Sequence, residues 1–455
     1  MEDLKMEYIK QPEKRVPITS KSEVLVVGGG VAGLSAAVAA ARLGCKTMLI
    51  EEGGCLGGTV SLGLMQSFMG VDLSVNRGFF AEFYEKLKEA GSLIEGFHSP
   101  FDLEVFKWIA IETAEKEGID LLLHTRAIEV KRERNKILGV LIDNKSGPQA
   151  IMSDVVVDAS GDADVAAMAG ENFDKVKKDE HGMTLLFRVV GADVYKFAAF
   201  VKEQQNKDEF FAIGGHHDSS HLDLDREKPL ATIGGFKGLI KKARENGELY
   251  LTHDNMFISF IPTKGIALIN ATHVIGFDPL SGKDLTLAEI ECRKQMMSVF
   301  SFLQKYVPGF ENISLLDSAS HIGVRESRRL IGEYVLTFDD IKKGKNFNDA
   351  IALNFMPIDI HGPGEQQTWI KLENPYQIPF RSLQAKKNKN LLVAGRSIST
   401  DHIVQGSTRS IPCCFATGQA AGAAAALAAK NSVSFSKLDI KALQQTLIQQ
   451  GVRIV

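Results

Sequence analysis

The first clear pattern of apolar and polar positions describes a strand, a glycine turn, a helix and a second strand. Glu23–Val27 is short, apolar and β-branched, and three glycines follow it directly. Val31–Leu43 is rich in alanine and strongly helical, and Gly44 ends it. Lys46–Ile50 is again apolar and extended in character. The pattern therefore predicts a βαβ unit with a tight first turn.

Further along the chain, the same periodicities predict helices and strands on both sides of a middle region. The helices are expected at Asp102–Lys116, Leu285–Tyr306 and Ser410–Ala429. The strands are expected at Gly118–Arg126, Ile137–Ile142, Asp154–Ala159, Met183–Val190, Met256–Ile261 and Asn390–Ala394, with a turn at Arg134–Asn135. Because Met183–Val190 and Met256–Ile261 follow a change of character near Gly170, we assign them to a different sheet.

This organisation predicts an α/β fold built on a discontinuous, Rossmann-like nucleotide domain. That domain should hold a parallel sheet with helices and a small antiparallel β layer, and an α+β substrate domain should interrupt it. We expect an N-terminal extension at residues 1–21 and the first part of the nucleotide domain at 22–175. The inserted domain should cover 176–354, and the C-terminal part of the nucleotide domain 355–455.

Composition narrows the class of protein. The chain has 455 residues, 44% of them hydrophobic, and a net charge of -3, so it lacks the basic stripe of a nucleic-acid-binding protein. Met1–Ser20 is too polar for a signal peptide, and the apolar run Ala420–Ala429 is too short to span a bilayer. Five cysteines without a CxxC pair fit a reducing compartment. We expect a soluble, cytoplasmic protein that binds no membrane.

The glycine turn has the spacing of a dinucleotide site. Gly28, Gly30 and Gly33 form GxGxxG between a strand and a helix, and Glu51 ends the next strand. The first glycine permits the tight turn, the second lets a pyrophosphate approach the backbone, and the third lets helix and strand pack closely. The helix N-terminus attracts phosphate, and an acidic residue at the position of Glu51 accepts hydrogen bonds from ribose hydroxyls.

The C-terminal region favours FAD over NAD, because the longer cofactor needs a second contact surface. Leu391–Ala394 is a strand that leads into the turn Gly395–Arg396. Gly418–Gly422, which includes Ala420 and Ala421, is a run of small residues in a predicted helix. Small side chains would let the backbone approach a flavin, and the helix N-terminus would favour an anionic reduced flavin. Simple helix packing is the alternative explanation for this run.

Six stretches of sequence resemble the FAD-dependent oxidoreductase family of the glutathione-reductase-like flavoprotein superfamily, in a type that lacks an NAD(P) domain. They are VLVVGGGVAGLSAAVAAARLG, VVVDASGDADVAAMAG, GVRESRRLIGEYVLT, PIDIHGPG, and NLLVAGRSIS with GSTRSIPCCFATGQAAG. More distantly, the chain is similar to fumarate-reductase-type flavoproteins. The resemblance implies an FAD-binding fold with an inserted substrate domain, but no particular substrate. On this basis the expected FAD contacts are Gly28, Gly30, Val31, Ala32, Gly33, Glu51, Glu52, Gly58, Ala127, Ser160, Gly161, Asp162, Gly395, Arg396, Gly418, Ala420 and Ala421.

Two features are missing from the sequence. No second GxGxxG follows a later strand, so a nicotinamide domain is not expected. Cys55 lies in the loop after Glu51, where disulfide reductases of the superfamily carry a redox pair, but the next cysteine is Cys292. We therefore expect Cys55 to be a small apolar residue rather than a reactive thiol. Linkage of the flavin to Cys55 or His402 stays open.

Three residues are candidates for the chemistry: Arg325, Asp359 and His361. Arg325 and Arg329 would share one face of a predicted helix, and an arginine fork suits a carboxylate or a flavin carbonyl. An ion-paired helix is the alternative. Asp359 and His361 would point the same way from an extended piece, and a histidine exchanges protons near neutral pH. The alternative is a loop histidine bonded to backbone.

His402 is a second candidate for proton transfer. A histidine-rich stretch, Gly214, Gly215, His216, His217 and His221, lacks the paired carboxylates of a metal site, so no metal is expected.

These residues favour an enzyme that transfers a hydride between a small organic substrate and flavin N5. Two other functions are open: reduction of an activated double bond in the manner of fumarate reductase, and a flavoprotein whose FAD is structural or passes electrons to a partner. The electron donor or acceptor is not identified, and a homo-oligomer stays open.

Overall fold

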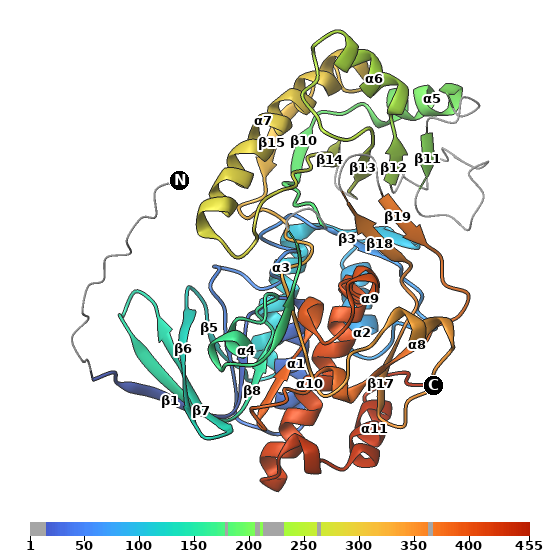
Figure 1. The fold of residues 1–455 in the computed structure, drawn as a ribbon. Helices are drawn as coiled ribbons and strands as arrows, with labels where there is room; N and C mark the ends of the chain where they lie inside the picture. Colours follow the sequence, from blue (N-terminus) through green and yellow to red (C-terminus); the bar gives the residue numbers. More distant parts are fainter. Residues whose placement is uncertain (1–14, 178–180, 205–209, 213–231, 262–264, 363–366) are drawn as a thin grey trace.

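A seven-stranded sheet forms the base of the molecule. The computed structural model describes residues 15–177, 181–204, 210–212, 232–261, 265–362 and 367–455 (Figure 1). The strand order is β5-β2-β1-β8-β7-β6, and β21 also pairs with β8. The strands that run parallel are β1 (Ile18–Val27), β2 (Thr47–Ile50), β5 (Asp120–Leu122), β8 (Gln149–Asp158) and β21 (Leu391–Val393). The strands β6 (Arg126–Glu133) and β7 (Lys136–Asp143) form an antiparallel hairpin beside them. This confirms the predicted α/β fold.

Two helices from opposite ends of the chain pack closely against each other beside this sheet. Helix α1 (Val31–Arg42) follows β1, and α10 (Ile411–Asn431) comes near the end of the chain. A Cβ at Gly418 would lie 2.1 Å from the carbonyl oxygen of Ala32, and one at Gly422 would lie 2.0 Å from that of Ala36. The two backbones therefore touch where α10 has glycine. Three more helices surround the pair: α2 (Phe79–Glu89), α3 (Leu103–Lys116) and α11 (Ile440–Gln449).

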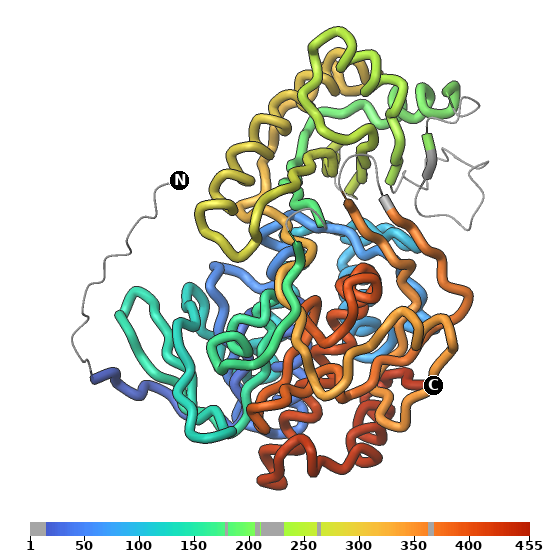
Figure 2. The backbone as a smooth tube through the Cα atoms, viewed as in Figure 1, coloured from blue at the N-terminus to red at the C-terminus, as the bar shows by residue number. Residues whose placement is uncertain are grey.

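A second, antiparallel sheet lies at the far end of the molecule, at the top of Figure 1. Its strand order is β11 (Phe210–Ala212), β12 (Thr232–Gly235), β13 (Met256–Phe260), β14 (Ile266–Asn270), β10 (Phe187–Val190) and β15 (Ser314–Ser318). The helices of this part are α5 (Val194–Gln204), α6 (Lys237–Glu245) and α7 (Gly282–Tyr306). All of these elements fall inside the range predicted for the inserted domain, and Figure 2 shows the backbone passing up from the first sheet and back.

Short elements connect the two sheets. They are β3 (Ser67–Met69) with β4 (His98–Pro100), β9 (Phe173–Lys175) with β16 (Arg328–Leu330), β17 (Ala350–Asn354) with β20 (Tyr376–Pro379), and β18 (Ile358–His361) with β19 (Gln367–Ile370). Three helices of one or two turns lie among them, namely α4 (Asp164–Met168), α8 (Phe338–Lys342) and α9 (His402–Thr408). Helix α9 packs against β18, since a Cβ at Gly406 would lie 3.0 Å from the carbonyl oxygen of Asp359.

The structure corrects two predicted elements. Arg325 and Arg329 do not share a helix face, because Arg328–Leu330 is a strand paired with β9. The long-range pairing of this strand with β9, together with the bond from Arg329 to Asp174 of that strand, outweighs the helical spacing. The strand predicted at Gly118–Arg126 covers only Asp120–Leu122, because His124 has a left-handed backbone with φ 52°. The histidine-rich stretch His216–His221 lies outside the described residues.

One helix of the described part of the chain, α10, is long and apolar enough to cross a membrane. In the fold, 83% of its most apolar window is buried, as in the core helix of a globular protein.

Candidate cofactor and substrate site

Four loops meet at the carboxyl edge of the parallel strands. Gly28 follows β1, Glu51 follows β2, Ala159 follows β8 and Gly395 follows β21. A Cβ at Gly28 would lie 2.5 Å from the carbonyl oxygen of Ala159, and the Ala394 N–H donates to the Asp158 carbonyl at 2.9 Å. Ligands of open α/β sheets bind at this edge, so the predicted cofactor residues come together where a nucleotide is expected.

The glycines of the first turn play distinct roles. Gly28 has a φ of 99°, and a Cβ at Gly33 would lie 1.8 Å from the Gly28 carbonyl oxygen, so both are required by the packing of the turn. Gly30 differs, because a Cβ there would meet only the Gly58 Cα, at 3.9 Å. The space in front of Gly30 is therefore open. It lies at the start of α1, where no side chain caps the helix and where Val31 and Ala32 begin the first turn. This geometry fits the pyrophosphate of FAD.

Glu51 is buried and held in a fixed position. Its carboxylate accepts hydrogen bonds from the N–H groups of Gly29 and Gly53, both at 2.6 Å. Each carboxylate oxygen has a further lone pair for a ribose hydroxyl. The Glu51 carbonyl accepts from the N–H of Thr125 at 2.9 Å, two residues before the half-buried Ala127 of β6.

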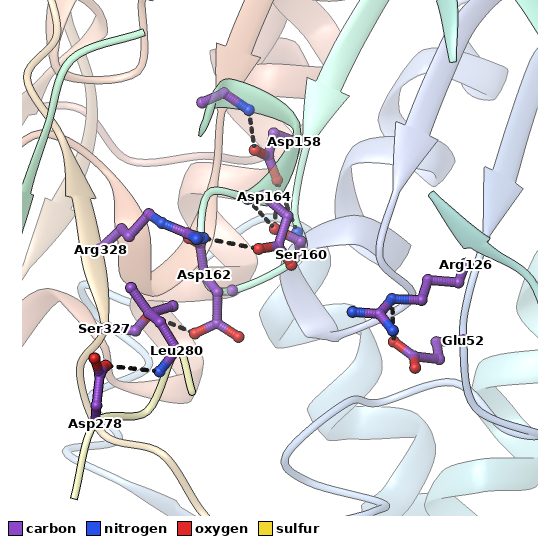
Figure 3. Close-up of polar contacts among 12 residues, drawn as sticks. Glu52, Arg126, Asp158, Ser160, Asp162, Asp164, Asp278, Leu280, Ser327 and Arg328 are labelled. Atoms are coloured by element: carbon purple, nitrogen blue, oxygen red, sulfur yellow. Dashed lines mark hydrogen bonds and ion pairs between the residues drawn. The ribbon is translucent and has the colours of Figure 1, made fainter. Parts of the chain in front are cut away.

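Glu52 points away from this position. Its side chain is exposed and lies 4.0 Å from Arg126, as the pair on the right of Figure 3 shows. It is the predicted FAD contact that lies furthest toward solvent on this loop.

The loop after β8 is tied to the turn after β21. Arg396 donates from Nε to the Gly161 carbonyl at 2.6 Å and from Nη2 to the Asp162 carboxylate at 2.5 Å. It also donates to the Val324 carbonyl. Ser160 donates through Oγ to the buried Asp158, at 2.6 Å. The expected cofactor residues Ser160–Asp162 and Gly395–Arg396 thus form one connected unit, next to the segment that carries Arg325.

Burial raises the pKa of Asp158 to about 6, and Ser160 partly opposes this shift. Figure 3 shows Ser160, Asp162 and Asp164 on one side of this loop, with Arg328 bonded to Asp164 at 2.8 Å.

The run of small residues in α10 lies in a helix contact. Gly418 packs on the α1 backbone at Ala32, and Ala420 and Ala421 are fully buried. Helix α10 begins at Ile411, two residues after Arg409. Helix packing explains the glycine at Gly418, and contact of Gly418, Ala420 and Ala421 with FAD stays a prediction.

The three candidate chemical residues come together. In β18, His361 Nε2 lies 3.0 Å from Asp359 Oδ2, and a second group, Arg409, donates to the same carboxylate oxygen at 3.0 Å. Arg325 donates to the Gly182 carbonyl at 2.7 Å and to Thr184 Oγ1 at 2.8 Å. Burial first, and then the nearby charge of Arg325, lower the pKa of His361, and Asp359 opposes this. Burial and Arg409 lower the pKa of Arg325 to about 10.

Four more histidines surround this group. The ring of His181 lies 6.3 Å from that of His361 and 5.8 Å from that of His402. The ring of His273 lies 6.3 Å from that of His361 and 5.2 Å from that of His253. Burial is the largest cause that lowers the pKa values of His181, His253 and His273, and for His253 the result is about 4. His402 Nδ1 lies 2.7 Å from the buried Glu326.

Sequence reasoning did not single out Arg409, His181, His253 or His273. Arg409 lies inside the matching stretch at Gly406–Gly422, which was the available signal for it. The three histidines are isolated in sequence and show no spacing signal. Among the described residues, no group of three or more histidine, cysteine, aspartate or glutamate side chains is arranged to hold a metal ion.

The cysteines have no disulfide partners among the described residues. Burial raises the pKa of Cys55 and so disfavours its reactive thiolate. Cys414 is buried between the two halves of the site: a Cβ at Gly395 would lie 4.0 Å from its Sγ, and its Sγ lies 3.6 Å from the Arg409 carbonyl oxygen. The histidine and arginine group is therefore adjacent to the turn where the flavin end of the cofactor is expected.

Comparison with known proteins agrees with this geometry. The sequence model of the family described as FAD dependent oxidoreductase matches residues 23–447. A geranylgeranyl bacteriochlorophyll reductase-like protein from Thermoplasma acidophilum has a similar fold, with 14% identity, 96% of this chain and 85% of that chain covered, and a TM-score of 0.51. A triple mutant of the flavin-dependent brominase Bmp2 has 12% identity, coverage of 94% and 84%, and a TM-score of 0.52. At these identities the two solved structures show the shared fold alone.

Proposed function

Since this chain belongs to the FAD-dependent oxidoreductase family, we propose that it transfers a hydride between a small organic substrate and flavin N5, without a nicotinamide domain. The observation that carries the proposal is the position of Arg325, Asp359, His361 and Arg409. They form one group, and it adjoins the Gly395–Arg396 turn through Val324 and Cys414. Side chains that bind an anion and move a proton thus lie where the substrate would meet the flavin.

FAD is the cofactor, and it supplies a two-electron acceptor or donor. Gly28, Gly30 and the first N–H groups of α1 fit its pyrophosphate, and Glu51 fits a ribose. The Ser160–Asp162 loop and the Gly395–Arg396 turn extend this surface toward the histidines.

His361 would move the proton that accompanies the hydride. A carboxylate only accepts hydrogen bonds, so Asp359 holds the proton of His361 on Nε2 and leaves Nδ1 with a lone pair. Because the pKa of His361 lies below its usual range, the ring is neutral at neutral pH and is ready to accept a proton. Arg325 and Arg409 supply two positive charges beside it, which suit an anionic group on the substrate.

Two substitutions test this function. Arg325→Met should lower the rate or weaken substrate binding by about tenfold to a hundredfold, the value of a charge-assisted hydrogen bond. His361→Asn should lower the rate by about a hundredfold or more while FAD stays bound. The rate is measured per bound flavin by stopped-flow reduction under anaerobic conditions.

Matched controls are Arg293→Met on the outer face of α7 and His321→Asn, which is exposed. If Arg325→Met and His361→Asn lower stability and flavin content together but leave the rate per flavin unchanged, the two residues have only a structural role. Reoxidation of the dithionite-reduced enzyme by enoates, without any reduction by candidate donors, would replace the proposal with reduction of an activated double bond.

A further inference from the structure

Buried polar atoms without a hydrogen-bond partner gather beside Arg325. Among the described residues, neither ring nitrogen of His181 has a hydrogen-bond partner, although only 7% of this residue is exposed. Within the described part of the chain, Nε2 of His273, also 7% exposed, and Nε of Arg409 have no partner either. Leaving a buried donor or acceptor unmet costs stability, and native proteins do so mainly where a ligand or a function requires it. These atoms come from three separate segments, so no local turn or cap explains them.

The positive and negative charges of this cluster do not balance. The guanidinium groups of Arg325 and Arg409 repel each other, and Asp359 is the carboxylate that acts on Arg325. The neighbouring carboxylate, Glu326, is already matched by Arg329 at 2.5 Å. With the histidines neutral, two positive charges therefore face one negative charge. One further anion would balance them.

The neutral histidines limit which chemical group the ligand can carry besides the anion. A neutral imidazole has one N–H donor and one lone pair, and the ring of His181 offers both without a partner. A hydroxyl oxygen can accept a hydrogen bond from the N–H of His181 while its hydrogen is donated to the lone pair on Nδ1 of His361, and an ether, an alkene or a carbonyl cannot do both. His181 lies beside the ring of His361, at 6.3 Å between centroids, so one hydroxyl would reach both residues.

We infer that the substrate is a small monocarboxylate that carries a hydroxyl group, and that it is oxidised at the carbon bearing that hydroxyl. The inference rests on the proposed function. Arg325 and Arg409 bind the carboxylate, and His181 donates a hydrogen bond to the hydroxyl oxygen. The C–H bond of the carbinol breaks and its electron pair leaves as hydride to FAD. The O–H proton passes to Nδ1 of His361, and a C=O bond forms.

This arrangement disfavours dicarboxylates and enoates. A second carboxylate would add an uncompensated negative charge beside Asp359. An enoate has no hydroxyl for His181, and its reduction would need a proton donor where His361 is neutral.

The first test uses the purified wild-type holoenzyme and short monocarboxylates with a hydroxyl at C2 or C3. Each is compared with its amide, with its deoxy acid and with the dicarboxylate of similar size. Perturbation of the flavin absorbance and a rise in Tm report binding, and anaerobic bleaching reports oxidation. We expect at least one hydroxy acid to bind and bleach the flavin, and its amide to bind about tenfold to a hundredfold more weakly.

The second test uses His181→Leu, with His321→Leu as the exposed control. We expect bleaching by that hydroxy acid to slow by about threefold to tenfold, the value of a lost hydrogen bond between neutral groups. Binding of the deoxy acid, which has no hydroxyl, should not change. His181→Asn keeps an N–H donor and should restore part of the rate. Should His181→Leu weaken binding of the deoxy acid as much as that of the hydroxy acid, His181 acts on the fold and the inference fails.

The outcomes separate this inference from the proposed function. Bleaching by neutral alcohols, amines or dicarboxylates, with no preference for hydroxy monocarboxylates, overturns the substrate class and keeps hydride transfer. Absence of bleaching by every donor class overturns the proposed function, and the inference falls with it.

Discussion

Nε2 of His361 lies 3.0 Å from Oδ2 of Asp359, two residues earlier in the same strand. The alternation of side chains along a strand places residues i and i+2 on one face, so β18 itself orients the pair. The same carboxylate also receives Arg409. Asp359 therefore links the proton-handling ring to one of the two arginines.

Asp359→Asn should change the pH dependence of the reaction in a defined direction. The negative charge of Asp359 raises the pKa of His361 against burial and Arg325. Its removal lowers that pKa further, so the acidic limb of the pH–rate profile should move to lower pH. The plateau rate should fall, because the ring loses its orienting partner. The measurement is the rate of flavin reduction across pH, with the exposed Asp339→Asn as control. A limb that moves to higher pH contradicts this account.

Gly30→Val should remove FAD and leave the fold intact. A branched side chain would fill the open space in front of Gly30, where the pyrophosphate fits. We expect a folded, colourless protein, measured by the ratio of flavin to protein absorbance and by Tm. Gly33→Val is the contrasting variant: its Cβ would collide with the Gly28 carbonyl oxygen, so it should lose the fold as well as the flavin. Full flavin content in folded Gly30→Val would show that the pyrophosphate lies elsewhere.

NADH and NADPH should reduce the flavin slowly or not at all. The sequence has one GxGxxG motif, and we assign its residues to the pyrophosphate of FAD. Stopped-flow bleaching faster than about 1 per second, an ordinary turnover rate, would reveal a nicotinamide site.

Gly418→Val should destabilise the protein. Its Cβ would lie 2.1 Å from the Ala32 carbonyl oxygen, so α10 would have to move away from α1. Overpacking of this kind typically costs about 1–3 kcal/mol of unfolding free energy. Denaturant unfolding measures the loss, and Ala429→Val, at a half-buried position of the same helix, is the matched control. Equal stability of the two variants would contradict the tight contact.

Acid should destabilise the fold through its buried histidines. Burial lowers the pKa values of His181 and His273 in the folded protein. At acidic pH these two histidines therefore bind protons in the unfolded chain but not in the native state. Their contribution is full above the unfolded pKa of about 6.5 and is lost as the pH falls below it, by about 1.4 kcal/mol per pH unit for each histidine. Urea unfolding at pH 7 and pH 5 should show the loss, and His181→Gln should reduce it by about 2 kcal/mol. An unchanged slope in this variant would mean that His181 titrates normally.

The sequence predicted the nucleotide half of the molecule well because its signals are local. Gly28, Gly30, Gly33 and Glu51 are close in sequence, and the packing of the turn backbone itself requires glycine at Gly28 and Gly33. The helix predicted around Arg325 was wrong because strand pairing with β9 decided the local structure. Asp359 and His361 could be paired from their spacing in an extended segment.

His181 and Arg409 could not be paired with them in this way. They reach the site from distant parts of the chain, and their importance depends on burial and on missing partners. Neither property is visible in a sequence pattern.

The contact of α1 with α10 also bears on how the protein is made. The ribosome synthesises β1, α1 and the first glycine turn well before the Gly395 turn and α10. Until then the face of α1 that covers Ala32 and Ala36 has no partner, and the cofactor surface lacks one of its four loops. The complete cofactor surface therefore forms only after α10 has been synthesised, and until then α1 exposes an apolar face, the kind of transiently exposed surface that makes incomplete chains prone to aggregation.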